Sequence, residues 1–516
     1  MSDAEKPELR RANDNPWYCL ATLHGEQPAQ EDWDKDLAAK NRMAWNRWMA
    51  GVLSDEQRAD LVKKGFSEAE LVPLTPAEES AFCSAFASRM GGEKELPPNP
   101  TEFVDFTFTH FDCVVIFRGF LYVGNADFSS AKFSLYADFR SAKFSGEAHF
   151  LSAQFFGNAS FGSAKFSLAN FSLAKFSGNA HFRSAEFSVA NFNSATFSVA
   201  NFISAKFSVA DFFSAKFCGN ANFGSTMFSV ANFNSATFAV ADFDSAKFFG
   251  NAKFSSATFT EANFSSGKFS EADFNSAKFS VANFSSAKFS GDAKFINAEF
   301  TANTVFADAR FETAVPDFRG AKMHEATEWH GVSWPSAPRD KDTAQAQVYA
   351  YERLKQEMER LKKYEDEQFF FRKELRARRG LISPQFFFRK ELRARRRLVS
   401  PGFGAWLLNY FYEASSDYGQ SIGRPLLWLF VVFVIGSAIF AGTPVSNGTR
   451  MTIPGAAGLS FANIFSFLPL THEFMIAEMT VGLSSAAKIV SVVQSVLGAL
   501  LLFLLGLALR TRFRMR

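Results

Sequence analysis

The sequence predicts a mainly β protein, a long β-solenoid with helical segments before and after it. Phenylalanine supplies 66 of the 516 residues, and from Phe128 to Phe318 it recurs at 37 positions, mostly five residues apart. Proline is absent from residue 101 to residue 315. Together these observations indicate a repeated structural unit rather than an ordinary globular core.

The spacing within each unit is that of an extended chain followed by a turn. Alanine stands two residues before nearly every one of these phenylalanines, as in Ala190-Asn191-Phe192. In an extended segment two such side chains point to the same side, and the serine, glycine and asparagine of the next two places favour turns. A helix of 3.6 residues per turn cannot hold a five-residue spacing on one face. Without proline, every backbone N–H can join a hydrogen-bonded ladder.

These units, A-[DN]-F-S-x and A-K-F-S-x, resemble the pentapeptide-repeat proteins, whose pattern is A-[DN]-[LF]-x-x. The resemblance covers residues 126–320 and implies a right-handed quadrilateral β-helix with four units in each coil. The 37 units then give about nine coils, a rod of roughly 45 Å at ~4.8 Å per coil. We expect this solenoid, with its caps, to occupy residues 101–338.

Some steps between phenylalanines are six residues long instead of five. Most of these steps contain a glycine two places before the alanine, as in Gly146-Glu147-Ala148 and Gly219-Asn220-Ala221. We interpret them as one-residue bulges at a corner of the coil, in which glycine adopts a backbone conformation that other residues avoid.

A four-sided coil brings the residue before every fourth phenylalanine into one surface column. Its members are mostly lysines: Lys143, Lys165, Glu186, Lys206, Met227, Lys247, Lys268 and Lys288. We favour a solvated face that keeps a long rod soluble, and the alternative is a binding surface for an anionic partner. Neighbouring faces carry mainly asparagine and aspartate: Asp138, Asn191, Asn201, Asp211, Asn222, Asp242 and Asp273.

Residues 1–100 predict a small helical N-terminal region. Trp45 and Trp48 belong to an apolar face interrupted by charge, and Ser54–Gln57 and Thr75–Glu78 have the spacing of capping boxes at helix starts. The segment Asn15–Glu26 resembles the N-terminal segment of membrane-anchored pentapeptide-repeat proteins. We expect this region to cap the solenoid or to support assembly.

Residues 339–401 predict a basic helical stalk. Apolar residues at helical spacing, among them Tyr351, Leu354 and Met358, indicate one long helix over 340–379. A 17-residue segment then occurs twice in tandem, and the shared stretch 369–379 returns as 386–396. Residues 372–397 contain 11 basic and 2 acidic side chains, so we expect contact with anionic lipid headgroups rather than with nucleic acid.

Residues 402–516 predict a membrane domain with two spans, at about 425–442 and 489–509. Both uncharged runs reach the ~20 residues that a helix needs to cross a bilayer. Arginines precede the first span and follow the second, whereas the connecting loop carries only Arg450 and Lys488. The positive-inside rule therefore predicts a multi-pass protein of the bacterial inner (plasma) membrane, with both termini and the solenoid in the cytoplasm.

The loop over residues 456–482 is the one segment that favours a sharper function. Its apolar part, Ala456–Leu470, is too short to span and is typical of a re-entrant or interfacial helix. It is followed by His472, Glu473, Glu478 and Thr480-Val481-Gly482. This order resembles the pore module of two-span potassium channels, although Leu483 and Ser484 replace the second half of the filter that a carbonyl pore needs.

We predict no catalytic, cofactor-binding or metal-binding residues and therefore no enzyme. His324 and His330 are six residues apart, whereas a zinc-protease helix needs four, so we expect a structural role for them in the C-terminal cap. The sequence thus favours a non-enzymatic, membrane-anchored scaffold that binds an unknown protein partner, and solenoids of this kind can pack end to end as homo-oligomers. One alternative is an ion channel, and another is a gyrase-binding DNA mimic. The 16 basic and 15 acidic side chains of residues 126–320 disfavour the DNA mimic.

Overall fold

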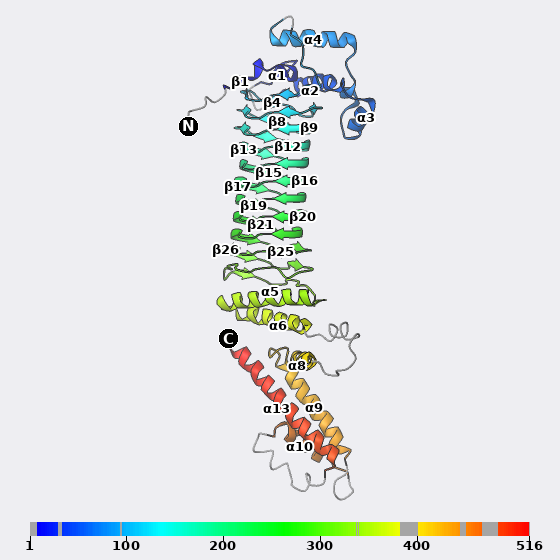
Figure 1. The fold of residues 1–516 in the computed structure, drawn as a ribbon, viewed down its shortest axis with the longest axis vertical. Coiled ribbons are helices and arrows are strands. Elements are labelled where there is room, and N and C mark those ends of the chain that lie inside the picture. The colour runs from blue at the N-terminus through cyan, green and yellow to red at the C-terminus, as the bar shows by residue number, and fades with distance from the viewer. Residues whose placement is uncertain are drawn as a thin grey trace. The chain divides into compact units, whose positions relative to one another are not determined.

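A computed structural model describes residues 8–28, 33–92, 95–336, 338, 340–381, 401–443, 450–466 and 483–514 (Figure 1). The chain divides into two compact units, Met1–Ser336 and Ala337–Arg516. The first contains the solenoid and the second is helical. We describe each unit by itself.

Two parallel sheets form the solenoid within the described ranges. One has 16 strands: β1 (Arg10–Arg11), β3 (Thr109–Phe111), β4 (Val115–Ile116), β7 (Lys132–Phe133), β8 (Ala137–Asp138), β10 (Gln154–Phe155), β11 (Ala159–Ser160), β13 (Lys175–His181), β15 (Thr196–Asn201), β17 (Lys216–Asn222), β19 (Thr237–Asp242), β21 (Thr258–Asn263), β23 (Lys278–Asn283), β26 (Glu299–Phe300), β27 (Thr304–Val305) and β29 (Thr327–Glu328). The other has 13: β2 (Val104–Asp105), β5 (Leu121–Tyr122), β6 (Ala126–Asp127), β9 (Lys143–His149), β12 (Lys165–Asn170), β14 (Glu186–Asn191), β16 (Lys206–Asp211), β18 (Met227–Asn232), β20 (Lys247–Lys253), β22 (Lys268–Asp273), β24 (Lys288–Phe289), β25 (Ala293–Lys294) and β28 (Arg310–Phe311).

The solenoid has about 11 turns, so the predicted nine are too few. The additional turns lie outside residues 126–320, where the alanine–phenylalanine spacing is lost. At the start, Phe106 and Phe111 stack on Phe128 and Phe133 of the next coil. At the end, Trp329 stacks on Phe306 at 4.7 Å between ring centroids. Valine, threonine and tryptophan replace the repeat residues there, which hides these coils from a search for the repeat.

Four columns of stacked aromatic rings fill the interior. In consecutive coils the Phe192 and Phe212 rings are 4.7 Å apart and tilted by only 2°. Rings of different columns meet edge to face, as Phe192 does with Phe202 at 85°. The alanines point inward as well, and Ala195 and Ala205 are fully buried. The predicted inward pair of alanine and phenylalanine is therefore confirmed.

Every second corner of the coil is a tight turn with one residue, in most coils a serine, in the left-handed region. Ser204 has a φ of 58°, and the Ala205 N–H closes the turn on the Phe202 carbonyl at 2.9 Å. The other corners are bends within longer strands such as β15 and β16. Serine thus takes the unusual backbone conformation in most coils, and glycine takes it in coils at the two ends, at Gly119, Gly320 and Gly331.

The six-residue steps are bulges, as predicted, but the reason proposed for their glycines is wrong. At Gly219 the seven-residue strand β17 shifts register against the six-residue β15. Gly219 is not among the glycines with positive φ. A Cβ built on it would lie 2.4 Å from the Ser198 carbonyl oxygen of the preceding coil. Glycine is needed there for close approach of two backbones.

The N-terminal helices cover the first coil (Figure 1). They are η1 (Ala12–Asp14), α1 (Pro16–Ala21), α2 (Lys35–Ala50), α3 (Asp55–Lys63), η2 (Glu68–Leu71) and α4 (Pro76–Met90). Both capping boxes form, at Ser54 and at Thr75. From α2, the Trp45 ring stacks on Phe120 and its Nε1–H donates to the Leu121 carbonyl at 2.8 Å. This region therefore closes one end of the solenoid core.

In the second unit, the predicted single helix over 340–379 is a hairpin of α5 (Lys341–Arg360) and α6 (Tyr364–Leu381). Lys362 has a φ of 58°, so the chain leaves the helix after Leu361. The predicted apolar face is buried at Tyr351, Leu354 and Met358. Folding back lets α6 cover this face, which a straight helix would leave in water.

The remaining helices of the second unit are α8 (Pro401–Ser416), α9 (Gly423–Ala441), α10 (Ile453–Ile464) and α13 (Ser485–Arg514). Helices α9 and α13 are long and apolar enough to cross a membrane. Helix α9 covers all but the last residue of the predicted span 425–442, and α13 encloses the predicted span 489–509. The short apolar helix expected after the first span is α10, which packs on both α9 and α13.

Candidate functional site: a basic groove on the solenoid

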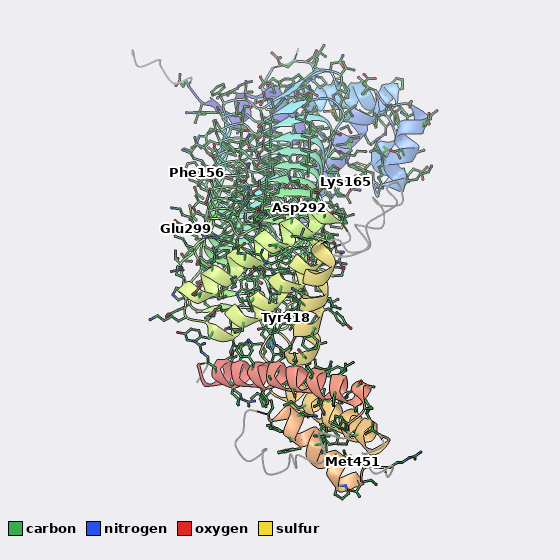
Figure 2. All side chains as sticks on the ribbon, turned by 60° about the horizontal axis from the view of Figure 1, so that its bottom comes forward. Phe156, Lys165, Asp292, Glu299, Tyr418 and Met451 are labelled. Atoms are coloured by element: carbon green, nitrogen blue, oxygen red, sulfur yellow. The ribbon has the colours of Figure 1, made fainter. Side chains whose placement is uncertain are left out.

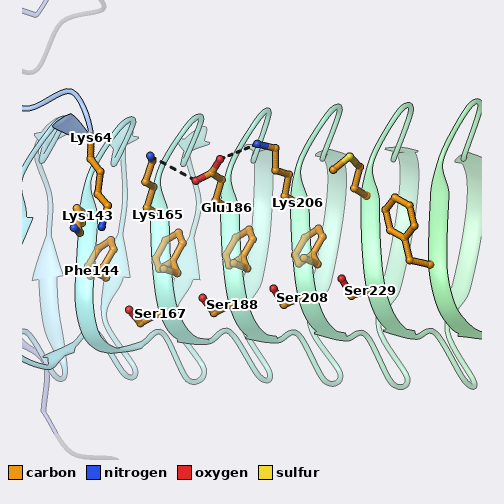
Figure 3. A pocket seen from close by; sticks show the side chains of 15 residues that line it. Lys64, Lys143, Phe144, Lys165, Ser167, Glu186, Ser188, Lys206, Ser208 and Ser229 are labelled. Atoms are coloured by element: carbon orange, nitrogen blue, oxygen red, sulfur yellow. Dashed lines mark hydrogen bonds and ion pairs between the residues drawn. The ribbon is translucent and has the colours of Figure 1, made fainter. Parts of the chain in front are cut away.

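The predicted lysine column forms on the outer face of the 13-stranded sheet. Strand register places Lys143 beside Lys165, then Glu186, Lys206 and Met227, one in each successive coil. These residues line an open groove of about 530 Å³ (Figure 3). A parallel row of serines lines the same groove: Ser167, Ser188, Ser208 and Ser229. Because the interior is filled with rings, such outward side chains carry the surface chemistry of this unit (Figure 2).

Glu186 interrupts the run of lysines and neutralises part of it. Lys206 Nζ donates to Glu186 Oε1 at 3.0 Å, and Lys165 Nζ lies 3.5 Å from Glu186 Oε2. The hydrogen bond from Lys206, followed by the charge of Lys165, lowers the pKa of the Glu186 carboxyl. Beyond Lys206 the groove turns apolar at Met227 and at Phe249, whose side chain is exposed. Positive charge is therefore concentrated at the end near the N-terminal helices.

At that end a second hollow, of about 440 Å³, opens between the N-terminal helices and the coils. Lys64, directly after α3, reaches the end of the column beside Lys143 (Figure 3). The cations that line this hollow are Arg42, Lys64, Arg118, Lys143 and Lys165, and its one carboxylate is Glu70. Burial, and next the charge of Lys64, lowers the pKa of the Lys143 ammonium. The hollow thus gathers like charges from separate parts of the chain.

Both carboxylate oxygens of Glu70 are hydrogen-bonded to residues in the wall of the hollow. Its two carboxylate oxygens accept hydrogen bonds from Arg42 Nε at 2.9 Å and from Asn46 Nδ2 at 3.0 Å. Asn46 Nδ2 also donates to the Gly119 carbonyl at 3.0 Å. Glu70 therefore fixes η2 and α2 against the first coil and has no carboxylate oxygen left to pair with Lys143.

Sequence analysis identified Lys143 and Lys165 but missed Lys64 and Arg118. Both missed residues lie outside the repeat, and no pattern around them connects them with the column. Their proximity depends on how α3 and the first coil pack, which the repeat does not encode.

The asparagines and aspartates of the neighbouring faces have a structural role that was not predicted. Each accepts a hydrogen bond from the backbone N–H two residues later, as Asn201 Oδ1 does from Ile203 and Asp242 Oδ1 from Asp244. This bond closes an Asx turn immediately before the tight serine turn. The [DN] place of the repeat already contained this signal, because aspartate and asparagine favour such turns.

Other residues that the sequence singled out lie elsewhere. His324 and His330 lie at the C-terminal end of the solenoid, where His324 Nδ1 accepts from the Ala326 N–H at 3.1 Å and the His330 carbonyl from the Asp308 N–H at 2.9 Å. No group of metal-ligating side chains occurs among the residues that the structure describes. His472, Glu473, Glu478, Thr480–Gly482 and the second copy, 386–396, lie outside those residues.

The first copy of the basic segment forms part of α6 and makes ion pairs within its own unit. Arg372 and Arg376 lie 3.3 Å from the Asp417 carboxylate, and Arg376 and Arg379 pair with Glu413 of α8. Contact of this segment with lipid headgroups stays a prediction.

A buried polar network joins the three apolar helices α9, α10 and α13. Gln494 of α13 donates to the Val432 carbonyl of α9 at 3.2 Å and to Ser460 Oγ of α10 at 2.5 Å. Its Oε1 accepts from Asn463 Nδ2 at 3.2 Å, and Ser491 Oγ donates to Asn463 Oδ1 at 2.8 Å. The network holds α10 against both long helices.

Comparisons with known proteins agree with the repeat. Residues 252–291 match the family model described as pentapeptide repeats, in eight copies. A solved structure from the cyanobacterium Nostoc sp. strain PCC 7120, of the protein HetL, described as a pentapeptide repeat protein involved in heterocyst differentiation regulation, is 17% identical. It covers 42% of this chain and 88% of its own, with a TM-score of 0.21. No curated protein sequence matches the chain.

Proposed function

Because this chain is a pentapeptide-repeat protein, we propose that it is a non-enzymatic scaffold anchored in a membrane, with the solenoid as its binding surface. The observation that carries the proposal is the pair of helices α9 and α13, each long and apolar enough to span a bilayer, in the same chain as a rigid solenoid. Inside the solenoid the backbone N–H groups are used in ladders between coils. Recognition of a protein partner therefore falls to outward side chains at fixed spacing.

The arginines around the two spans support the proposed location. Arg424 lies in the first turn of α9, and Arg510 and Arg512 lie at the end of α13. By the positive-inside rule, these arginines support our proposal that the solenoid and both termini lie in the cytoplasm of a bacterial cell, at the inner membrane.

Removal of residues 398–516 tests the anchor. We expect the shortened protein to move from the membrane fraction to the soluble fraction, while the full chain resists extraction from membranes by alkaline carbonate. A shortened protein that stays with the membrane would contradict an anchor formed by α9 and α13.

A second candidate function is ion conduction, and one observation favours it. The polar network around Gln494 holds the short helix α10 between two apolar helices, an arrangement that could line a path through a closed oligomer. The test is to determine the oligomeric mass of the purified protein in detergent and to measure current across planar bilayers. A symmetric oligomer that conducts ions would favour the channel over the scaffold, and a silent monomer or dimer would exclude it.

A further inference from the structure

The hollow between the N-terminal helices and the first coils is a candidate anion site. Five cationic side chains and one carboxylate line it, and that carboxylate, Glu70, is fully engaged by Arg42 and Asn46. Lys64 has the exposed Asp60 as its partner. Among the described residues, no carboxylate lies within ion-pairing distance of Lys143 or Arg118. Lys165 is paired with Glu186, so the cations of the hollow that keep no ion pair among the described residues are Lys143 and Arg118.

Lys143 is the lysine of the hollow that lacks an ion-pair partner within the described part of the chain. Its ammonium is partly buried, and burial and the charges of Lys64 and Lys165 disfavour its charged form, while the charge of Asp60 offsets only part of this effect. The lowered pKa of Lys143 means that folding disfavours its charged form. In the unbound protein, stability consequently rises as the pH increases from this lowered pKa to the ordinary value of about 10.4. A bound anion would offset this loss of stability, because a nearby negative charge favours the charged form of the Lys143 ammonium.

The spacing of the cations indicates a ligand with several negative charges. Lys143 and Lys165 are register neighbours in adjacent coils. Arg118 lies on a turn of the preceding coil, where the Gly119 N–H donates to the backbone carbonyl of Arg140 in the next coil. Three coils therefore contribute, over a distance of roughly 10 Å at ~4.8 Å per coil. A single carboxylate would reach only part of this row, whereas a chain of two or three phosphates matches its length.

Hydroxyl groups accompany the cations. Ser67, Ser141 and Ser163 line the same hollow, and the last two occupy tight turns with φ near 56°. Hydroxyl donors together with lysine and arginine are a common set of partners for phosphate oxygens.

The extent of the charged area argues for a small ligand rather than a long acidic polymer. Along the column beyond Lys165, Glu186 pairs with two lysines, and the groove then becomes apolar at Met227 and Phe249. A polyanion lying along the solenoid would thus cross a neutralised and an apolar stretch before it met the next lysines of the column, Lys247 and Lys268. We propose that this hollow binds a small molecule that carries a diphosphate or triphosphate group.

The test is calorimetric titration of the full-length protein in detergent with inorganic triphosphate, in buffer without magnesium and at low salt. We expect saturable binding that weakens as salt is added. Lys143→Gln should weaken binding about tenfold, the effect of ~1.4 kcal/mol. The matched control is Lys268→Gln, which removes the same charge from the same column outside the hollow and should bind as the unaltered protein does.

A second measurement protects the result against misfolded variants. Triphosphate should raise the melting temperature of the unaltered protein and of Lys268→Gln, but much less that of Lys143→Gln. Arg118→Gln, an exposed residue on a turn, should repeat the loss of affinity. Absence of binding by the unaltered protein, or an equal loss in Lys268→Gln, would overturn the proposal.

Two further titrations identify the source of the phosphate. ATP that binds at least as tightly as inorganic triphosphate would support a nucleotide, and much weaker binding of ATP would support an inorganic polyphosphate. A doubly phosphorylated peptide that binds more tightly than both would overturn the proposal in favour of a protein ligand.

Discussion

At the scale of single residues, serine and glycine have exchanged the roles that their backbone preferences suggest. Ser204 and its equivalents adopt the left-handed region at most of the tight turns, although glycine enters that region at less cost. Gly219 occupies a bulge where its backbone dihedral is ordinary and only the missing Cβ matters. The sequence revealed where the corners are, but it could not show which of the two constraints acts at each corner.

The close approach at Gly219 gives the first prediction. Gly219→Ala should destabilise the coil by about 1–3 kcal/mol, the usual cost of overpacking, because its Cβ meets the rigid backbone oxygen of Ser198. Gly224→Ala is the control in the same coil, since its nearest neighbour, at 3.0 Å, is the side-chain oxygen of Asn222. Chemical denaturation of both variants should show the larger loss for Gly219→Ala, and equal losses would contradict the backbone clash.

Asn201 gives a second prediction at this scale. Asn201→Ala removes the acceptor for the Ile203 N–H and should cost about 1 kcal/mol, the typical value of one hydrogen bond. Asn201→Asp retains the acceptor and should recover most of the loss in the same denaturation experiment. If both variants behaved alike, the Asx turn would have no part in stability.

At the scale of elements, local sequence predicted the type of each element better than its partners. The capping boxes at Ser54 and Thr75 and the apolar faces of the helices follow from residue spacing. The break at Lys362 does not, because no glycine or proline marks it. The chain folds back there because α6 covers the apolar face of α5, and Lys355 reaches the buried carboxylate of Glu374 at 2.6 Å. Such tertiary contacts override local helix propensity.

Gln494 tests how the apolar helices of the second unit are joined. Gln494→Leu should lower stability by about 1 kcal/mol, within the range for polar contacts between helices in membranes. The change deprives Ser460 and Asn463 of a partner and frees α10 from α13. Val493→Leu, at an exposed neighbouring position, is the control. Thermal unfolding in detergent should separate the two variants, and an unaltered melting temperature in Gln494→Leu would contradict the role of the network.

At the scale of the molecule, the solenoid is a sum of nearly equal coils. The count of nine from sequence fell short because the terminal coils keep the ring stack but lose the repeat. The basic hollow could be predicted only in part for a related reason. Its lysines at 143 and 165 follow from the repeat, whereas Lys64 and Arg118 come from the segments that close the solenoid.

Equal coils predict that one of them can be removed. Deletion of residues 206–226 joins Ala205 to Met227, the register partner of Lys206, and should yield a folded rod that is shorter by ~4.8 Å. Deletion of residues 206–223 leaves the inward positions out of phase and should abolish folding around the junction. Circular dichroism and limited proteolysis compare the two deletion variants. Similar resistance to protease in both would contradict the prediction that only a whole coil can be removed without loss of the fold.

The ladder also determines how the rod would respond to force. Its hydrogen bonds run from coil to coil, along the axis, so tension between the two ends of the solenoid loads all coil interfaces in series. The weakest interface gives way first, and the rest stay intact until they are loaded again. A coil of about 20 residues releases roughly 70 Å of chain at ~3.4 Å per residue. A stretched solenoid would therefore lengthen in even steps at low force, and it would act as an extensible tether rather than as a stiff strut.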